Sequence, residues 1–502
     1  MTSALPPAVS RLIEAYRPVH DLQAAAAVLS WDQETMMPPG GREARGRLLG
    51  TLAGLRHDHP AGSAFADALA GCDSEALAHD PALQALVREA RKLHDRAVCI
   101  PAELTRALAE ATSEGLATWQ RARAADDFGI FRDSLARIID LVGQKADALA
   151  EGGSRYDALL DLYEAGSVEA ELTPLFEGLR AELAPLVQAA AASSVQVDES
   201  PAQGHFNPDA QYAFGHAIAQ AIGFDFDSGR LDQAAHPFCT GFDVGDVRLT
   251  WRFQEDDFRP ALFGILHEMG HGLYEQGLPA DWRGTPIGSA VGLGVHESQS
   301  RLWENLVGRS RSFWEWLMPH FRAAFPQHPK FDVDAIYPAL HTIRPSLIRV
   351  EADEATYNLH VAARYDLERK LFAGEITVDD LPEAWDATYQ DLLGVHAPSA
   401  ADGVLQDIHW AMGAFGYFPT YTQGNLIAAQ LFDAAREDLP GMEDGFARGE
   451  FAPLLEWLRT RIHQHGKMRT ADQLVREATG KPLSPEAFLS DLRSTASAVY
   501  EV

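Results

Sequence analysis

Apolar residues recur every three or four positions through the first two hundred residues. Residues 103–125 and 132–151 show this spacing most clearly, with Ala, Leu, Glu and Arg between the apolar positions. This period is typical of a helix with one buried face, and these residue types favour helix. Residues 189–204 are polar and rich in small side chains, yet nothing there demands a domain boundary. We therefore expect one domain, 1–502, that begins with packed helices.

One strand is marked by strict alternation within residues 243–253. Its apolar and polar positions alternate in the order Asp246, Val247, Arg248, Leu249, Thr250, Trp251, Arg252 and Phe253. Period-two alternation places the apolar set on a buried face. A strand of this kind can bind an extended peptide by edge addition, or Asp246 and Arg248 can simply hold the sheet together. Acidic residues and a proline follow at 254–260 and predict the start of a helix.

The overall charge excludes two classes of partner. The 502 residues include 42 Lys and Arg against 72 Asp and Glu, a net charge of −30. Nucleic-acid binding depends on cations that neutralise phosphates, so we expect no nucleic-acid partner and no docking to an anionic membrane. No apolar run is long enough to span a bilayer, the start lacks a signal-peptide pattern, and the three cysteines include no CxxC pair. These features predict a cytoplasmic protein.

The helix expected at 261–275 contains the sequence His267-Glu268-Met-Gly-His271. Two imidazoles one turn apart share a helix face and can bind one metal ion, while Glu268 lies close enough to act on a water molecule without being a ligand. By residue frequency, about one chain in twenty of this composition would contain such a motif by chance. The alternative is a pair of hydrogen-bonded histidines without metal. The apolar face of the helix and its glycines, which suggest close backbone contacts, favour the metal site.

A catalytic zinc site uses three protein ligands and keeps one position open. Glu297, which lies 26 residues after His271, is the leading candidate for the third ligand. His296 and Glu304 compete with it. Glu304 could instead accept a hydrogen bond from a ligand, and Arg301 could pair with Glu297 one turn away.

These groups predict peptide or amide hydrolysis. A bound divalent ion lowers the pKa of water and polarises the scissile carbonyl. Glu268 would take the proton from the water and pass it to the leaving amine, a role worth about 10²–10⁴-fold in rate.

Six short motifs then give the sequence a specific resemblance. It resembles the thermostable metallocarboxypeptidases typified by carboxypeptidase Taq, whose motifs all occur here in the same order. They are His236-Pro-Phe238, Asp246-Val-Arg-Leu-Thr250, His267-Glu-Met-Gly-His271, His296-Glu-Ser-Gln299, Ile348-Arg-Val-Glu-Ala-Asp353 and Gly403-Val-Leu-Gln-Asp-Ile-His-Trp410. Segments 29–38, 156–160 and 415–421 also look like family sequence, so the resemblance covers nearly the whole chain.

The resemblance implies a mainly α, single-domain homodimer with a deep groove and a small antiparallel sheet beside the metal helix. The helical part at about 1–200 would form one wall or lid of this groove. The resemblance also implies the removal of C-terminal residues from peptides, with broad specificity and one Zn²⁺, or Co²⁺, per chain. Its ligands would be His267, His271 and Glu297, and Glu268 would be the catalytic acid and base.

A carboxypeptidase must recognise a free C-terminal carboxylate, which the fork of an arginine suits. Arg349 is the candidate, on an apparent long helix at 343–371. The inner face of this helix would also carry Asp353, Tyr357 and His360. The alternative is a structural ion pair of Arg349 with Asp353, four residues away. The resemblance favours Arg349 with Tyr421 as a carboxylate clamp.

Three further residues are candidates for the site. His409 would stabilise the oxyanion or orient the substrate, although a buried, hydrogen-bonded histidine fits the pattern equally well. Arg248 and Tyr417 complete the expected substrate-binding set. A packing role is the default for His236, and Trp31 is expected to be structural. Two other functions stay open: an endopeptidase or oligopeptidase on the same scaffold, and a non-enzymatic helical protein that binds peptides.

Overall fold

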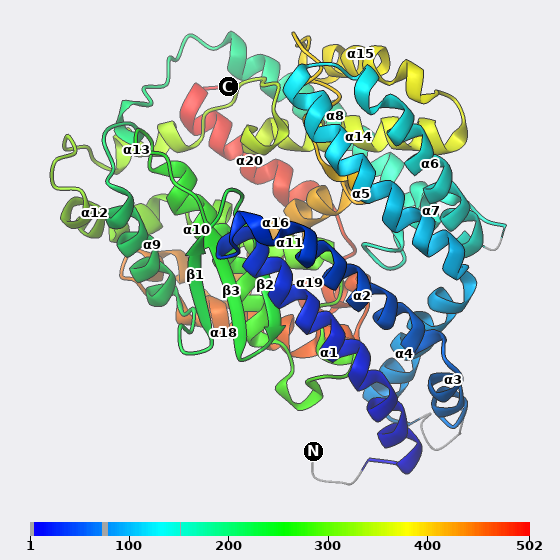
Figure 1. The fold of residues 1–502 in the computed structure, drawn as a ribbon. Coiled ribbons are helices and arrows are strands. Elements are labelled where there is room, and N and C mark those ends of the chain that lie inside the picture. Colours follow the sequence, from blue (N-terminus) through cyan, green and yellow to red (C-terminus); the bar gives the residue numbers. More distant parts are fainter. Residues whose placement is uncertain (1–4, 73–78, 151) are drawn as a thin grey trace.

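The computed structural model describes residues 5–72, 79–150 and 152–502. These residues form a mainly helical molecule with one three-stranded sheet near its centre (Figure 1). The mainly α fold predicted from the sequence is therefore confirmed. Among the described helices, none combines the length and the apolar character that a membrane crossing requires.

The N-terminal region is a succession of helices. They are α1 (Pro7–Thr35), α2 (Arg42–Ala61), α3 (Ser63–Ala70), α4 (Pro81–Cys99), α5 (Ala102–Ala125), α6 (Gly129–Ala150), α7 (Arg155–Leu160) and α8 (Glu169–Ala192). The helices predicted at 103–125 and 132–151 correspond to α5 and α6. The apolar positions that predicted α6 are buried, among them Leu135, Ile138 and Val142.

The sheet has the order β1-β3-β2, formed by β1 (Gly229–Gln233), β2 (Cys239–Asp243) and β3 (Asp246–Trp251). The β2–β3 pair is antiparallel, as predicted, but β1 pairs with β3 in parallel, so the sheet is mixed. Alternation along β3 predicted a strand with a buried apolar face, and Val247, Leu249 and Trp251 are buried, but Thr250 of the polar set is buried as well. The alternation contains no signal about the partner strands. Because β3 has a partner strand on both sides, it cannot add a substrate strand at its own edge.

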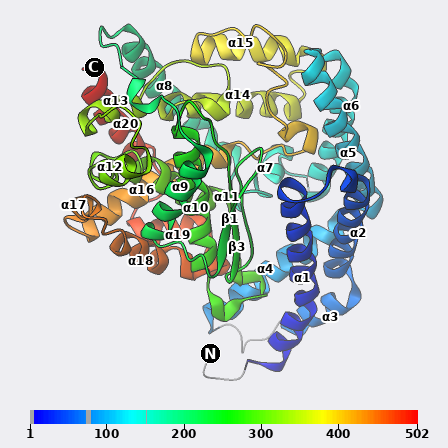
Figure 2. The same cartoon turned by 60° about the vertical axis from the view of Figure 1, so that its left-hand side comes forward.

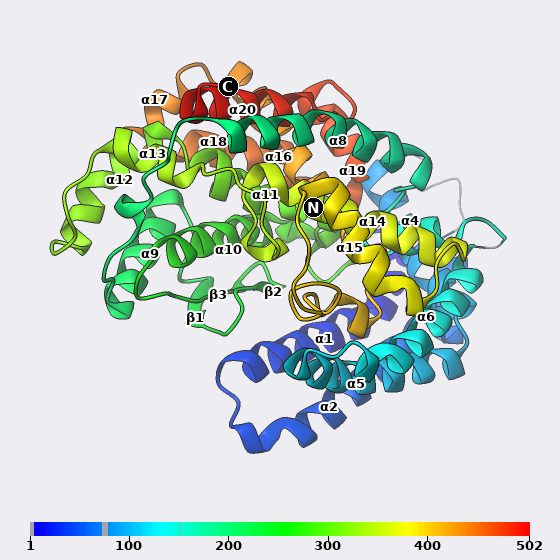
Figure 3. The ribbon, with the colours of Figure 1, turned by 90° about the horizontal axis from the view of Figure 1, so that it is seen from above.

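The remaining α-helices follow α8 along the chain. They are α9 (Pro208–Ile222), α10 (Arg259–Gly277), α11 (Leu293–Arg301), α12 (Arg311–Ala324), α13 (Val333–Leu340), α14 (Glu354–Ala373), α15 (Leu381–Leu393), α16 (Pro419–Asp438), α17 (Met442–Phe446), α18 (Ala452–Arg461), α19 (Ala471–Thr479) and α20 (Glu486–Tyr500). Helices α9 and α10 lie on one side of the sheet, and α1 packs against β2 from the other side (Figures 2 and 3).

Helices α10 and α11 approach each other unusually closely. A Cβ atom on Gly270 would lie 2.5 Å from the carbonyl oxygen of Gln299 and 2.6 Å from the Cα of Ser300. A residue with a side chain would therefore force the two backbones apart. This contact explains the helix-weakening glycine in the metal motif, and it brings the chain around Glu297 against the two histidines.

The long helix predicted at 343–371 begins later than expected. Helix α14 starts at Glu354, and Arg349 lies before it in a short 3₁₀ turn, Arg349–Glu351. Pro345 disfavours helical backbone in the residue before it. Asp353 then caps α14, because its Oδ1 accepts hydrogen bonds from the backbone N–H groups of Ala355 and Thr356. The prediction that Arg349 lies on this helix is therefore wrong.

Candidate metal centre and its surroundings

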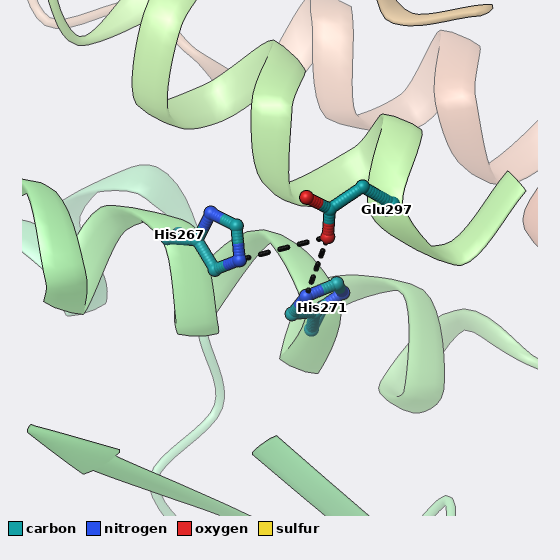
Figure 4. Close-up of side chains that lie close together, drawn as sticks. All are labelled: His267, His271 and Glu297. Carbon is teal, nitrogen blue, oxygen red and sulfur yellow. Dashed lines mark ion pairs between the residues drawn. The ribbon is translucent and has the colours of Figure 1, made fainter. Parts of the chain in front are cut away.

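Helix α10 directs His267 and His271 toward Glu297 of α11 (Figure 4). The Nε2 atoms of His267 and His271 lie 3.7 Å and 3.4 Å from Oε2 of Glu297. One ligand atom from each residue lies within 4.8 Å of the others, and among the described residues no other group of this kind occurs. The three residues predicted as ligands are thus brought together, whereas His296 and Glu304 lie outside the group.

The hydrogen bonds of the two histidines suit a metal ion. Nδ1 of His267 lies 2.8 Å from Oε2 of Glu304, and Nδ1 of His271 lies 3.0 Å from the carbonyl oxygen of His296. Because a carbonyl or carboxylate oxygen accepts, both Nδ1 atoms donate, and Nδ1 of His271 also lies 2.6 Å from Nδ1 of His296. The Nε2 atoms face Glu297, where a metal ion would replace any proton on them. Two imidazoles and a carboxylate are a donor set that fits Zn²⁺.

Charge at the centre also favours a cation. Burial alone would raise the pKa of Glu297, but Arg301, whose Nε donates to it at 2.7 Å, and the two histidines hold this pKa well below its usual range. Burial, aided by the neighbouring His296, lowers the pKa of His271 to about 3 and keeps it neutral. Burial opposes protonation of His267 too, yet Glu297 and Glu304 raise its pKa to about 9. The negative charges of Glu297 and Glu304, which favour a proton on His267, also favour a metal cation beside it.

Glu268 is buried beside the three candidate ligands, with 5% of its surface exposed. Burial raises its pKa to about 7; His267 opposes this rise, and Glu297 and Glu304 add to it. A carboxyl group with a pKa near neutrality can both accept and return a proton under ordinary conditions. The predicted acid and base therefore lies in an environment that suits its role.

Arg349 is held in a second buried cluster. Its Nε and Nη2 donate to Oδ1 of Asp407 at 3.1 Å and 2.9 Å, and its Nη1 donates to the Tyr357 hydroxyl at 3.0 Å. The ion pair weighed for Arg349 with Asp353 does not form. Asp407 also pairs with Arg364, which is fully buried, at 2.7 Å. Two arginines thus share one carboxylate, and the cluster keeps an excess positive charge.

Aromatic side chains surround Arg349. The ring centre of Tyr421 lies 5.0 Å from its Cζ, and the Tyr417 ring lies 5.4 Å from that of Tyr421. The Tyr421 hydroxyl is 3.4 Å from Nε2 of His409. Burial lowers the pKa of His409 to about 4, against the pull of Asp407, so this histidine is neutral at physiological pH. Tyr421, Tyr417 and His409 therefore belong to one group with Arg349.

Comparison with known proteins identifies the family of this chain. The family model described as carboxypeptidase Taq (M32) metallopeptidase matches residues 11–496. The chain belongs to this family. It is 45% identical to thermostable carboxypeptidase 1 of Thermus thermophilus, covering 98% of this chain and 99% of the relative. It is 35% identical to carboxypeptidase 1 of Bacillus subtilis, covering 95% of each chain.

Solved structures agree with this membership. The M32 carboxypeptidase of Deinococcus radiodurans superposes with a TM-score of 0.95 at 40% identity, covering 99% of this chain and 100% of that one. The chain is accordingly a metal-dependent carboxypeptidase, a hydrolase of the carboxypeptidase Taq family. The resemblance stated from the six motifs is confirmed.

Two residues of the motifs have surroundings that differ from those the sequence suggested. Arg248 pairs with Asp246 at 2.9 Å and stacks on Trp31 of α1 at 4.3 Å, so it joins the sheet to the N-terminal region. His236 is exposed, which contradicts the packing role assumed for it. Sequence reasoning assigned no role to Arg364, although a charged residue amid the apolar positions of α14 is an available signal for a buried ion pair.

Proposed function

We propose that this carboxypeptidase releases single residues from the free C-termini of peptides, with broad specificity, and uses one Zn²⁺ per chain. His267, His271 and Glu297 would hold the ion. The observation that carries the proposal is the convergence of these three donors, with both imidazoles oriented by hydrogen bonds from Nδ1. Co²⁺ also suits imidazole and carboxylate ligands, so it is the alternative metal.

When bound, the cation supplies Lewis acidity, which polarises the scissile carbonyl and lowers the pKa of water. Glu268 is the proposed base, since its carboxylate takes a proton from the attacking water. The same carboxyl group then protonates the leaving amine. A pKa near 7 serves both steps, because neither protonation state is strongly favoured at neutral pH.

Arg349 and Tyr421 are proposed to recognise the substrate carboxylate. Arg349, Arg364 and Asp407 together carry one net positive charge, and burial strengthens its attraction for an anion. Asp407 and Tyr357 occupy only part of the guanidinium, which offers five N–H donors. Tyr421 would add a hydroxyl donor.

His409, Tyr417 and Arg248 are proposed to have supporting roles. The neutral His409 would orient the substrate or donate to the oxyanion, and Tyr417 would line the same place. Arg248 would bind substrate where the sheet meets α1, although its pairing with Asp246 and Trp31 equally suits a structural role.

The assembly and location are proposals as well. We infer that residues 1–502 form a single domain and that the chain is a cytoplasmic homodimer, with residues 1–200 forming one wall or lid of the groove. The position of α1 across the sheet from α10 supports such a wall (Figure 3). Light scattering coupled to gel filtration tests the dimer.

The reaction is tested with one peptide and its C-terminally amidated twin. A time course on the free acid should release residues singly from the C-terminus, and the amide should lose most of the activity. Internal cleavage of both peptides at similar rates would instead identify an endopeptidase or oligopeptidase.

A further inference from the structure

A short segment of the N-terminal region reaches the helix that carries Glu297. Glu164 follows α7 and is buried, with 4% of its surface exposed. Its Oε2 accepts a hydrogen bond from the backbone N–H of Gly294 at 2.6 Å, and the N–H of Val295 also contacts its carboxylate. The carbonyl oxygen of Tyr163, one residue earlier, accepts from the N–H of Leu293 at 3.1 Å. The first turn of α11 is therefore held by residues 163–164.

The start of α11 is shaped to receive this carboxylate. Its own N-cap residue is Gly292, which has no side chain to cap the helix. A Cβ on Gly292 would lie 2.1 Å from Oε1 of Glu164, and a Cβ on Gly294 would lie 2.7 Å from Oε2. Both glycines thus leave space that Glu164 fills. Burial raises the pKa of Glu164 to about 7, against the backbone N–H groups of Gly294 and Val295, so the carboxyl oxygens cap the helix as hydrogen-bond acceptors.

The same turn of α11 contributes two groups to the metal centre. The carbonyl oxygen of His296 accepts from Nδ1 of His271, and Glu297 provides the carboxylate. Both residues lie within three positions of Gly294. A shift of this turn would therefore move a ligand and the acceptor that orients another ligand at the same time.

We propose that Glu164 is a positioning residue of the metal centre: it fixes the first turn of α11 and so sets the metal affinity without touching the ion. The inference rests on the proposed ligand set. It also means that the N-terminal region takes part in building the metal centre, because Glu164 lies some 130 residues before Glu297.

The test measures the zinc dissociation constant of the metal-depleted protein by competition with a coloured chelator. Glu164→Ala should weaken zinc binding about tenfold, as loss of groups that orient metal ligands commonly does. Glu164→Gln keeps an oxygen acceptor of the same reach and should restore most of the affinity. The matched control is Asp353→Ala, which removes the carboxylate cap of α14 and should leave the zinc affinity unchanged.

A second variant disturbs the same contact from the opposite side. Gly294→Ala places a methyl group against Glu164 but improves helix propensity, so weaker zinc binding in this variant cannot come from a poorer helix. In the double variant with Glu164→Ala, the methyl group should cause little further loss, because its main obstacle is absent and its other contact, Cβ of Gln423 at 3.2 Å, needs only a small shift. If Glu164→Ala does not fold, the single variant Gly294→Ala still tests the contact, because it keeps Glu164.

Wild-type zinc affinity in Glu164→Ala or in Gly294→Ala would overturn the proposal and leave Glu164 a purely structural cap. His271→Ala separates this result from a failure of the proposed ligand set. If His271→Ala binds zinc normally, the ligand set is wrong. If it loses zinc while the Glu164 variants retain it, only the positioning role is wrong.

Discussion

Single residues in this enzyme have their chemistry set by burial and by the charge next to them. Glu268 and Glu297 are both buried carboxyl groups at the candidate metal centre. Burial dominates at Glu268 and raises its pKa to about 7, whereas Arg301 and two histidines outweigh burial at Glu297 and keep it ionised. One carboxyl is therefore suited to exchange protons and the other to hold a cation.

Replacing Glu268 with Gln tests the first of these roles. The amide has nearly the same shape but cannot take a proton, so we expect kcat to fall by about 10²–10⁴-fold while the metal content stays the same. Turnover and bound metal are to be measured on the same preparation. Unchanged turnover would remove Glu268 from the reaction.

Arg349 allows a second test at this scale. Arg349→Ala leaves Asp407 paired with Arg364, so no unpaired buried charge results and the variant should fold. We expect kcat/KM for free-acid peptides to fall far more than for amidated peptides, because only the former offer a carboxylate. Equal losses on both substrates would assign Arg349 a structural role.

At the scale of elements, sequence patterns predicted the features that depend on residues close together in the chain. The apolar period predicted α5 and α6, alternation predicted β3, and the HExxH spacing predicted two histidines on one face of α10. The start of α14 was missed because a capping Asp353 looks like an ordinary helical residue in the sequence. The parallel pairing of β1 with β3 and the hydrogen bond between Glu164 and α11 join segments that are distant in the sequence. A local sequence pattern holds no information about such contacts.

The cap of α14 can be measured directly. Asp353 accepts hydrogen bonds from the backbone of Ala355 and Thr356 and from the Thr356 hydroxyl. Asp353→Ala should lower the free energy of unfolding by about 1–2 kcal/mol, and Asp353→Asn by less, because the amide oxygen still caps the helix. Urea denaturation provides the comparison; a stability for the Ala variant equal to wild type would show that the cap contributes nothing.

Across the whole molecule, buried carboxyl groups link stability to pH. Glu368, fully buried, accepts hydrogen bonds from the Tyr156 hydroxyl, the Trp410 indole and the Gly416 N–H. Burial nevertheless raises its pKa from 4.5 to about 7. Between these two values the folded chain holds a proton that the unfolded chain has lost, so the free energy of unfolding falls as pH rises through this window.

Glu368→Gln isolates this contribution, since the amide does not titrate. The stability of the wild type relative to the variant should decrease by up to about 3 kcal/mol as the pH rises from 4.5 to 7, and should change little above that. Denaturation curves at pH 5 and pH 8 measure the difference. A constant difference, or one that grows with pH, would mean that the folded protein carries Glu368 ionised throughout.

The central claim is that His267, His271 and Glu297 together bind one metal ion. It is tested most directly by an anomalous difference map at the zinc absorption edge, from crystals of the protein loaded with zinc. We predict one peak per chain at about 2.0–2.2 Å from Nε2 of both histidines and from a carboxylate oxygen of Glu297. A peak bound instead by His296 or Glu304, or no peak between α10 and α11, would contradict the account.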